Sequence, residues 1–208
     1  MPGAAYSQNV FVNCPFDPEY APIFDAIIFA VHDCGFVARC ALEEDDSAQV
    51  RVDKIYSIIS ECRLGIHDVS RTELDPALGL PRFNMPLELG VFLGARRFGG
   101  RRQREKRCLV LDRQRFRYQA YLSDISGQDI KAHGDDPARA VQVVRDWLSH
   151  FAPENVMLPG GRKMAERYGR FLDELPAMLE EAEIEKGELI YNNYTTLVVG
   201  WLKENSWG

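Results

Sequence analysis

The 208-residue sequence lacks a long hydrophobic run and a phosphate-binding glycine motif. No stretch of roughly 18 apolar residues occurs, which excludes a membrane-spanning helix. Residues 1–8 contain neither a basic nor an apolar signal region, so we expect no signal peptide. Neither Gly-x-x-x-x-Gly-Lys nor Gly-x-Gly-x-x-Gly is present, which disfavours P-loop, kinase and Rossmann dehydrogenase functions.

Cysteine and histidine are few and irregularly spaced, and the chain carries no net positive charge. The five cysteines form no Cys-x-x-Cys pair and the four histidines show no ligand spacing, so we expect neither a disulfide framework nor a metal site. Cysteines in apolar contexts predict reduced, buried thiols in a cytoplasmic protein. The net charge of −6 argues against general nucleic-acid binding, which needs a basic surface.

One segment departs from this acidic balance. Between Arg96 and Arg107, seven of the twelve residues are basic. Part of this charge complements the C-terminal dipole of a preceding helix, and the Gly99-Gly100 pair predicts a loop. A solvated loop is the favoured interpretation, and a contact with nucleic acid or protein stays open as the alternative.

Hydrophobic periodicity predicts that strands and helices alternate over the first half of the chain. Expected strands span residues 9–13, 36–42, 64–69 and 106–112, and expected helices span residues 20–34, 52–62 and 84–97. Such alternation is typical of crossover units that build a parallel sheet. The predicted fold is therefore α/β, a flavodoxin-like parallel sheet flanked by helices.

The sequence pattern in the second half of the chain predicts mainly helices. A weak edge strand at residues 129–133 precedes amphipathic helices at 135–151 and 163–186 and an aromatic tail. We assign residues 1–158 to the α/β domain and residues 159–208 to a C-terminal helical appendage. The appendage carries more apolar surface than a small sheet needs, so we expect it to build a homo-oligomer. Packing back on its own domain is the nearly equal alternative.

Residues 84–90, with the sequence NMPLELG, predict the start of a helix that carries a carboxylate. Asn84 suits the N-cap position, and Pro86 is tolerated in a first helical turn. Glu88 then lies where the helix dipole favours a negative charge, so we expect it to stay ionised near neutral pH. An ionised carboxylate is what a nucleophile or a stabiliser of a cationic transition state requires.

A second carboxylate follows a buried strand at residues 66–70, with the sequence IHDVS. Strand ends and helix starts meet at one edge of a parallel sheet, so Asp68 and Glu88 are expected to face one cleft. Two acids there suit glycosyl transfer, in which one acts at the anomeric carbon while the other holds the ribose. The alternative is that Glu88 is only a helix-start charge, and the residues alone give both interpretations equal weight.

A strand that ends in Asp-Val-Ser, followed by a helix that opens with Asn-x-x-x-Glu-Leu-Gly, resembles the bacterial TIR-like predicted nucleotide-binding domains. The chain is similar, more distantly, to nucleoside deoxyribosyltransferases, and the resemblance covers roughly residues 8–112. It implies a TIR-like fold, a role for Glu88 at the N-glycosidic bond and a ribose- or substrate-binding role for Asp68. An insertion at residues 71–83 and a turn at 13–17 without the family's Gly or Ser residues depart from the pattern.

Further substrate-binding candidates lie at the same predicted edge. Asn13 and Phe16 follow the first strand, where an amide suits a ribose or phosphate and an aromatic ring suits a base. Arg39, on the second strand, pairs either with Glu43 or with a phosphate, and the ion pair is favoured. Asn84, at the helix start, completes the predicted set.

The residues and the resemblance together predict a cytoplasmic enzyme that cleaves or transfers at the N-glycosidic bond of a nucleotide. The first choice is NAD glycohydrolase activity in bacterial antiviral defence, with NAD as substrate and no separate cofactor. One alternative is a nucleoside deoxyribosyltransferase. The other is a non-catalytic nucleotide-sensing module. A membrane partner is not expected.

Overall fold

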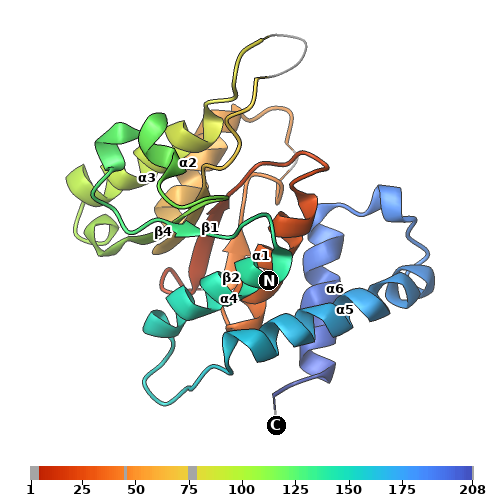
Figure 1. Ribbon diagram of the computed structural model, residues 1–208. Coiled ribbons are helices and arrows are strands. Elements are labelled where there is room, and N and C mark those ends of the chain that lie inside the picture. The colour runs from red at the N-terminus through yellow and green to blue at the C-terminus, as the bar shows by residue number, and fades with distance from the viewer. Residues whose placement is uncertain (1–4, 45, 75–78, 208) are drawn as a thin grey trace.

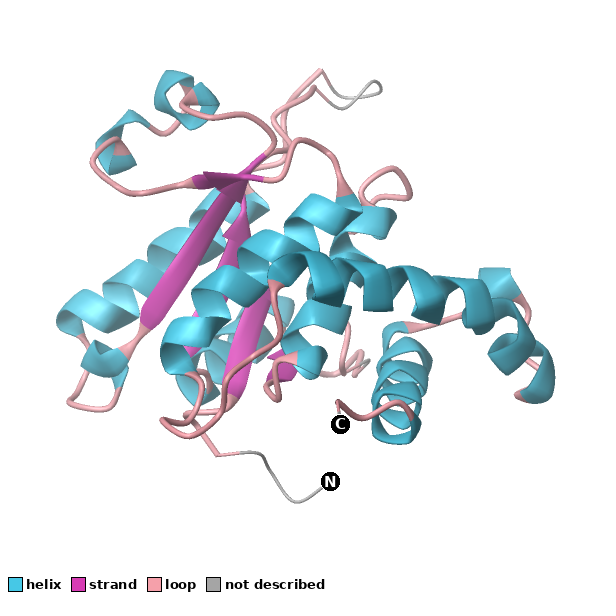
Figure 2. Cartoon of the chain, turned by 60° about the horizontal axis from the view of Figure 1, so that its bottom comes forward, coloured by secondary structure: helices cyan, strands magenta, loops and turns pink. Residues whose placement is uncertain are grey.

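The computed structural model describes residues 5–44, 46–74 and 79–207 and has a central parallel sheet with helices on both faces (Figure 1 and Figure 2). The strands are β1 (Asn9–Asn13), β2 (Val37–Arg39), β3 (Leu64–Asp68), β4 (Arg107–Asp112) and β5 (Lys131–Ala132). Their spatial order is β2-β1-β3-β4-β5, and each pairing is parallel. This is the flavodoxin-like order, so the predicted α/β fold class is confirmed.

Helices α1 (Ala21–Asp33) and α4 (Pro137–Leu148) cover one face of the sheet, and α5 (Gly161–Glu181) and α6 (Tyr191–Glu204) pack outside them. Eight of the thirteen residues of α1 are buried. A helix that is apolar on most sides needs cover on most sides. The sheet covers one side of α1, and the three later helices cover the others.

Helices α2 (Arg51–Glu61) and α3 (Asn84–Phe98) cover the opposite face, where Phe11, Ile59 and Phe92 share a core. Lys106 is fully buried beneath them, and its ammonium donates to the carbonyls of Ile59, at 2.5 Å, and Cys62. A cation at the last carbonyls of α2 satisfies orphan acceptors and complements the helix dipole. The buried lysine therefore has a structural role at the amino edge of the sheet.

The C-terminal helices belong to the main core. Phe171 and Val198 are fully buried, Trp201 is 2% exposed, and the Tyr191 hydroxyl donates to the Ala38 carbonyl at 2.9 Å. Residues 159–208 thus complete the layer over α1. The apolar surface that suggested an interface is largely used within the chain, and homo-oligomer formation stays a prediction.

Helix boundaries in the first half of the chain match the sequence closely, with one difference that matters. In the second half, α5 ends at Glu181 and not near residue 186, and the expected aromatic tail contains the helix α6. Gly35, at φ +81°, follows α1 and lets the Phe36 amide donate to the Val31 carbonyl at 3.1 Å, which ends the helix as predicted. The prediction that Asn84 caps α3 is wrong. Phe83 occupies the cap position without a side-chain hydrogen bond, and Asn84 is the first helical residue. Glu88 consequently lies in the second turn, where the helix dipole acts more weakly.

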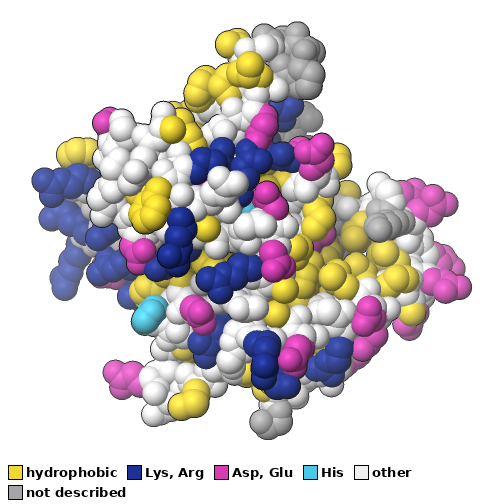
Figure 3. Space-filling model, in the orientation of Figure 1, with side chains coloured by type: hydrophobic (Ala, Val, Ile, Leu, Met, Phe, Trp, Pro, Cys, Tyr) yellow, Lys and Arg dark blue, Asp and Glu magenta, His cyan; other side chains and the backbone are white. Residues whose placement is uncertain are grey.

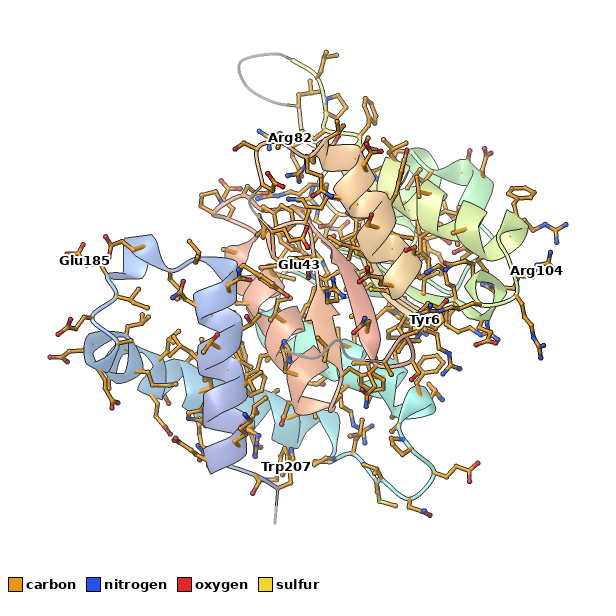
Figure 4. The ribbon with its side chains drawn as sticks, turned by 180° about the vertical axis from the view of Figure 1, so that it is seen from behind. Tyr6, Glu43, Arg82, Arg104, Glu185 and Trp207 are labelled. Atoms are coloured by element: carbon orange, nitrogen blue, oxygen red, sulfur yellow. The ribbon has the colours of Figure 1, made fainter. Side chains whose placement is uncertain are left out.

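The basic segment lies at the amino edge of the sheet (Figure 4). The Tyr6 hydroxyl donates to the Arg102 carbonyl at 2.7 Å, and the Arg102 guanidinium lies 4.1 Å from the centre of the Tyr6 ring. Arg104 points away from the body of the protein. Residues 99–106 are therefore held against the N-terminal segment, at the end of the sheet opposite the predicted site.

The five cysteines are free thiols, and four of them are buried. No helix within the described ranges combines the length and apolarity needed to cross a membrane.

Candidate functional site

The strand order places a topological switch point between β1 and β3, which are neighbours in the sheet but lead to helices on opposite faces. In open α/β sheets, ligands bind outside the carboxyl ends of the strands at such a point. Asn13 ends β1, and His67 and Asp68 end β3. The start of α3 lies at the same place, because the side chain of Asn13 bonds to the carbonyl of Met85 in the first turn of α3.

Asn13 joins β1 to the start of α3. Its side chain is 2% exposed, and its amide nitrogen lies 2.9 Å from the Met85 carbonyl and 3.1 Å from His67 Nδ1. Met85 precedes Glu88 by three residues. Asn13 therefore fixes the first turn of α3 against the sheet, and its role as a substrate ligand stays a prediction.

His67 is a packed core residue on the α3 face. Its ring lies edge-on to Phe92, with centroids 4.9 Å apart, and to Phe11 at 5.7 Å. A Cβ at Gly65 would lie 2.8 Å from both His67 and Phe92, so only glycine leaves room for this packing. Burial, with a smaller contribution from Lys106, lowers the pKa of His67 to about 3. The ring is therefore neutral at physiological pH.

Glu88 is the acid held at this switch point. It is 8% exposed and lies on the inward face of α3 with Leu89 and Phe92. Burial raises the pKa of Glu88 to about 7, and the charge of nearby Arg51 opposes that rise. The expectation that the carboxyl group is fully ionised near neutral pH is therefore wrong, because desolvation outweighs the helix dipole in the second turn.

Asp68 points to the other face of the sheet. Its side chain is fully buried, its Oδ1 accepts from the Ser70 amide at 2.8 Å, and its Oδ2 lies 3.0 Å from His133 Nε2. The ring of Tyr20 lies edge-on to that of His133. The thiol of Cys14 completes this buried polar cluster beside Asp68. Successive strand residues alternate between faces, which is why His67 faces α3 and Asp68 faces α1.

The structure therefore does not bring Asp68 and Glu88 together as a facing pair. Asp68 lies among residues of the β1–α1 segment and the segment after β5, whereas Glu88 lies between α3 and the start of α2. The two carboxyl groups share the carboxyl edge of the sheet but occupy opposite sides of it.

The remaining predicted substrate ligands are also divided between the two faces of the sheet. Arg39 makes a bidentate ion pair with Glu43, at 2.6 and 2.7 Å, and a further bond to Glu61 at 3.0 Å, as the favoured interpretation expected. Asn84 is exposed at the start of α3. Phe16 is 38% exposed and packs edge-on against Phe24 of α1, on the face away from Glu88.

An ionic cluster around Asp112, at the carboxyl end of β4, was not predicted. Arg117 Nε donates to Asp112 Oδ1 at 2.9 Å, and the same guanidinium donates to the carbonyl of Ser70. The Tyr121 hydroxyl donates to Asp112 Oδ2 at 2.9 Å and lies 2.8 Å from the Val69 carbonyl. The cluster ties the ends of β3 and β4 together. The sequence does contain one indication of this cluster, because Asp112 ends a buried strand in the same way as Asp68.

Within the described ranges, no three His, Cys, Asp or Glu side chains are grouped so as to hold a metal ion. Comparison of the chain with protein-family models, with curated proteins and with solved structures finds no match.

Proposed function

We propose that the protein cleaves or transfers at the N-glycosidic bond of a nucleotide, with an NAD-type dinucleotide as substrate and Glu88 as the acting carboxylate. The observation that carries the proposal is a buried acid at the topological switch point, on a helix start that Asn13 anchors to β1. The choice of NAD, and of a cytoplasmic role in bacterial antiviral defence, rests on the resemblance of the motif to TIR-like domains.

The reaction needs one negative charge close to the anomeric carbon. Bond cleavage passes through an oxocarbenium-like transition state, which an ionised Glu88 would stabilise or capture covalently. Nicotinamide leaves as a neutral base because its ring nitrogen is cationic in the substrate, so no general acid is required. A site with one acid at this face suffices for that chemistry.

The raised pKa of Glu88 fits this role. A carboxyl group with a pKa near the working pH is poised between its two forms, which is typical of acids that act in catalysis. A cationic nicotinamide ring in the site favours the ionised form through its charge. Substrate binding would then generate the nucleophile that the reaction uses.

Asp68 takes a different role in this proposal from the one its motif position implied. Its contacts with Ser70 and His133 hold the end of β3, so it acts by positioning the chain that leads to α3. Deoxyribosyl transfer between bases uses the same Glu88 chemistry and stays the second candidate.

The test is to incubate the purified protein with NAD and, separately, with deoxynucleosides, and to separate the released bases by chromatography. Nicotinamide release that Glu88→Gln abolishes supports the proposal. Base exchange with deoxynucleosides alone supports the transferase. Inactivity with both, together with tight NAD binding by calorimetry, would contradict catalysis and favour a sensing module.

A further inference from the structure

A large cavity lies between the β1–α1 segment and the helices α5 and α6, on the face of the sheet away from Glu88. Its volume is about 1030 Å³. Figure 3 shows the opening as a hydrophobic hollow beside the C-terminal helices, with acidic side chains beyond it. Cavities of this size hold drug-sized or lipid-sized ligands.

The walls of the cavity are apolar and rich in aromatic rings. Phe16 and Phe24 line one side, and Tyr168, Tyr191 and Tyr194 line the other. Leu172, which is 41% exposed, stands at the opening. Such walls favour a hydrocarbon or aryl body, and the faces of aromatic rings attract cations.

Among the described residues that line the cavity, the charged groups are carboxylates. Asp25 of α1 and Glu180 of α5 are both present, and no lysine or arginine is among the described lining residues. Three further acids, Glu181, Glu183 and Glu185, follow Glu180 in sequence and are exposed, and Figure 4 shows Glu185 at the outer end of the α5–α6 connection.

Asp25 is the informative group among them. No basic side chain in the described parts of the chain pairs with its carboxyl group. Burial alone raises the pKa of Asp25 to about 6, so the group is mostly ionised at pH 7.5 and lacks a counter-charge. A partly buried carboxylate without a partner is costly, and an external cation would remove that cost.

We propose that this cavity binds an organic cation with an apolar body, such as an alkyl or aryl ammonium compound. The apolar portion packs between α1 and the α5–α6 pair, and the cationic group lies at Asp25 among the tyrosine rings. An anionic or neutral amphiphile of equal length lacks the complement to Asp25. The site is separate from the Glu88 site and does not depend on its chemistry.

The experiment is calorimetric titration of the full chain with decyltrimethylammonium and decyl sulfate, both below their micelle-forming concentrations, and with decanol below its solubility limit. The cation is expected to bind at least about tenfold more tightly than the other two, which corresponds to one ion pair in a partly buried setting. Equal affinity for the cation and the alcohol, or no binding of the cation, would overturn the proposal.

Two variants test the assignment of Asp25. Asp25→Asn should lower the affinity for the cation about tenfold and leave that for decanol unchanged. Asp53→Asn, an exposed acid on α2 across the sheet, is the matched control and should change neither. If Asp25→Asn does not fold, Leu172→Arg replaces it as the decisive variant, because a guanidinium at the opening should repel the cation while decanol still binds. Unchanged cation affinity in either folded variant would contradict the assignment.

Discussion

His133 Nε2 lies 3.0 Å from Asp68 Oδ2, and both side chains are fully buried. The contact is short but is not aligned as a hydrogen bond. His133 Nδ1 accepts from the Asp135 amide at 3.0 Å, so the ring proton is on Nε2, the nitrogen that faces Asp68. This pair joins the segment after β5 to the end of β3.

We predict that Asp68→Asn destabilises the fold by about 2–4 kcal/mol, because in either orientation the amide would turn its NH2 group toward the Ser70 amide or toward the ring proton of His133. Urea unfolding measures the change. Asp173→Asn, an exposed acid on α5, is the control and should stay within about 0.5 kcal/mol. If Asp68→Asn left stability unchanged and raised only the KM for NAD, Asp68 would be a ribose ligand instead.

Glu88→Gln is predicted to have opposite effects on activity and stability. Loss of the charge that stabilises the ribosyl cation should lower base release by on the order of 10²-fold or more. Removal of a buried charge should raise the free energy of unfolding at pH 8 by about 1–2 kcal/mol after solvent screening. Chromatography and urea unfolding measure the two effects. Glu204→Gln, on the exposed end of α6, should change neither.

A helix-start charge without a catalytic role would give a different result. Glu88→Gln would then change stability alone and leave base release within twofold of the wild type.

The pH dependence of kcat/KM should follow the ionisation of Glu88. Its pKa of about 7 means that the carboxylate forms as pH rises, so activity should increase about tenfold between pH 6 and pH 8. The stability change has the opposite sign. The folded protein binds the proton more tightly than the unfolded chain, so stability should fall as pH rises from about 4.5 to 7.

If Glu88 is not the acting group, the activity slope is absent, whereas the stability slope remains because it depends only on the raised pKa of Glu88. Activity that falls with rising pH would instead assign Glu88 the role of a general acid, as a deoxynucleoside with a poorly leaving base would require.

Arg51 offers a way to move that profile without touching Glu88. Its positive charge lowers the pKa of Glu88, so Arg51→Gln should shift the rising limb of the kcat/KM profile to higher pH. Arg51→Lys keeps the charge and should restore the wild-type profile. A drop in activity with no shift in the profile would mean that Arg51 acts on the substrate and not through Glu88.

The sequence predicted the sheet well because its signals are local. Buried strands such as Asn9–Asn13 and the helix stop at Gly35 depend on short stretches of chain. The predicted cap of α3 was one residue too late, and the observed start places Glu88 in the second turn. The exact end of a helix depends on packing against the rest of the fold, which the local sequence does not specify.

The contacts across the sheet were not predictable in the same way. His133 follows a two-residue edge strand, and nothing in its surrounding sequence indicates that it meets Asp68. The packing of α5 and α6 over α1 is, by contrast, indicated by the sequence. The helix from Ala21 to Asp33 is apolar on nearly every side, which indicates that more than one sheet face must cover it.

That signal leads to the last prediction, that truncation after Pro159 prevents stable folding. The truncation removes Phe171, Val198 and Trp201, each at most 2% exposed, and leaves the outer side of α1 uncovered. Loss of large core side chains costs about 3–5 kcal/mol each, which together exceeds the total stability of most domains of this size. Thermal unfolding followed by circular dichroism should show no cooperative transition. A truncated chain that melts cooperatively near the wild-type temperature would show that residues 159–208 are a separable appendage, available to build a homo-oligomer.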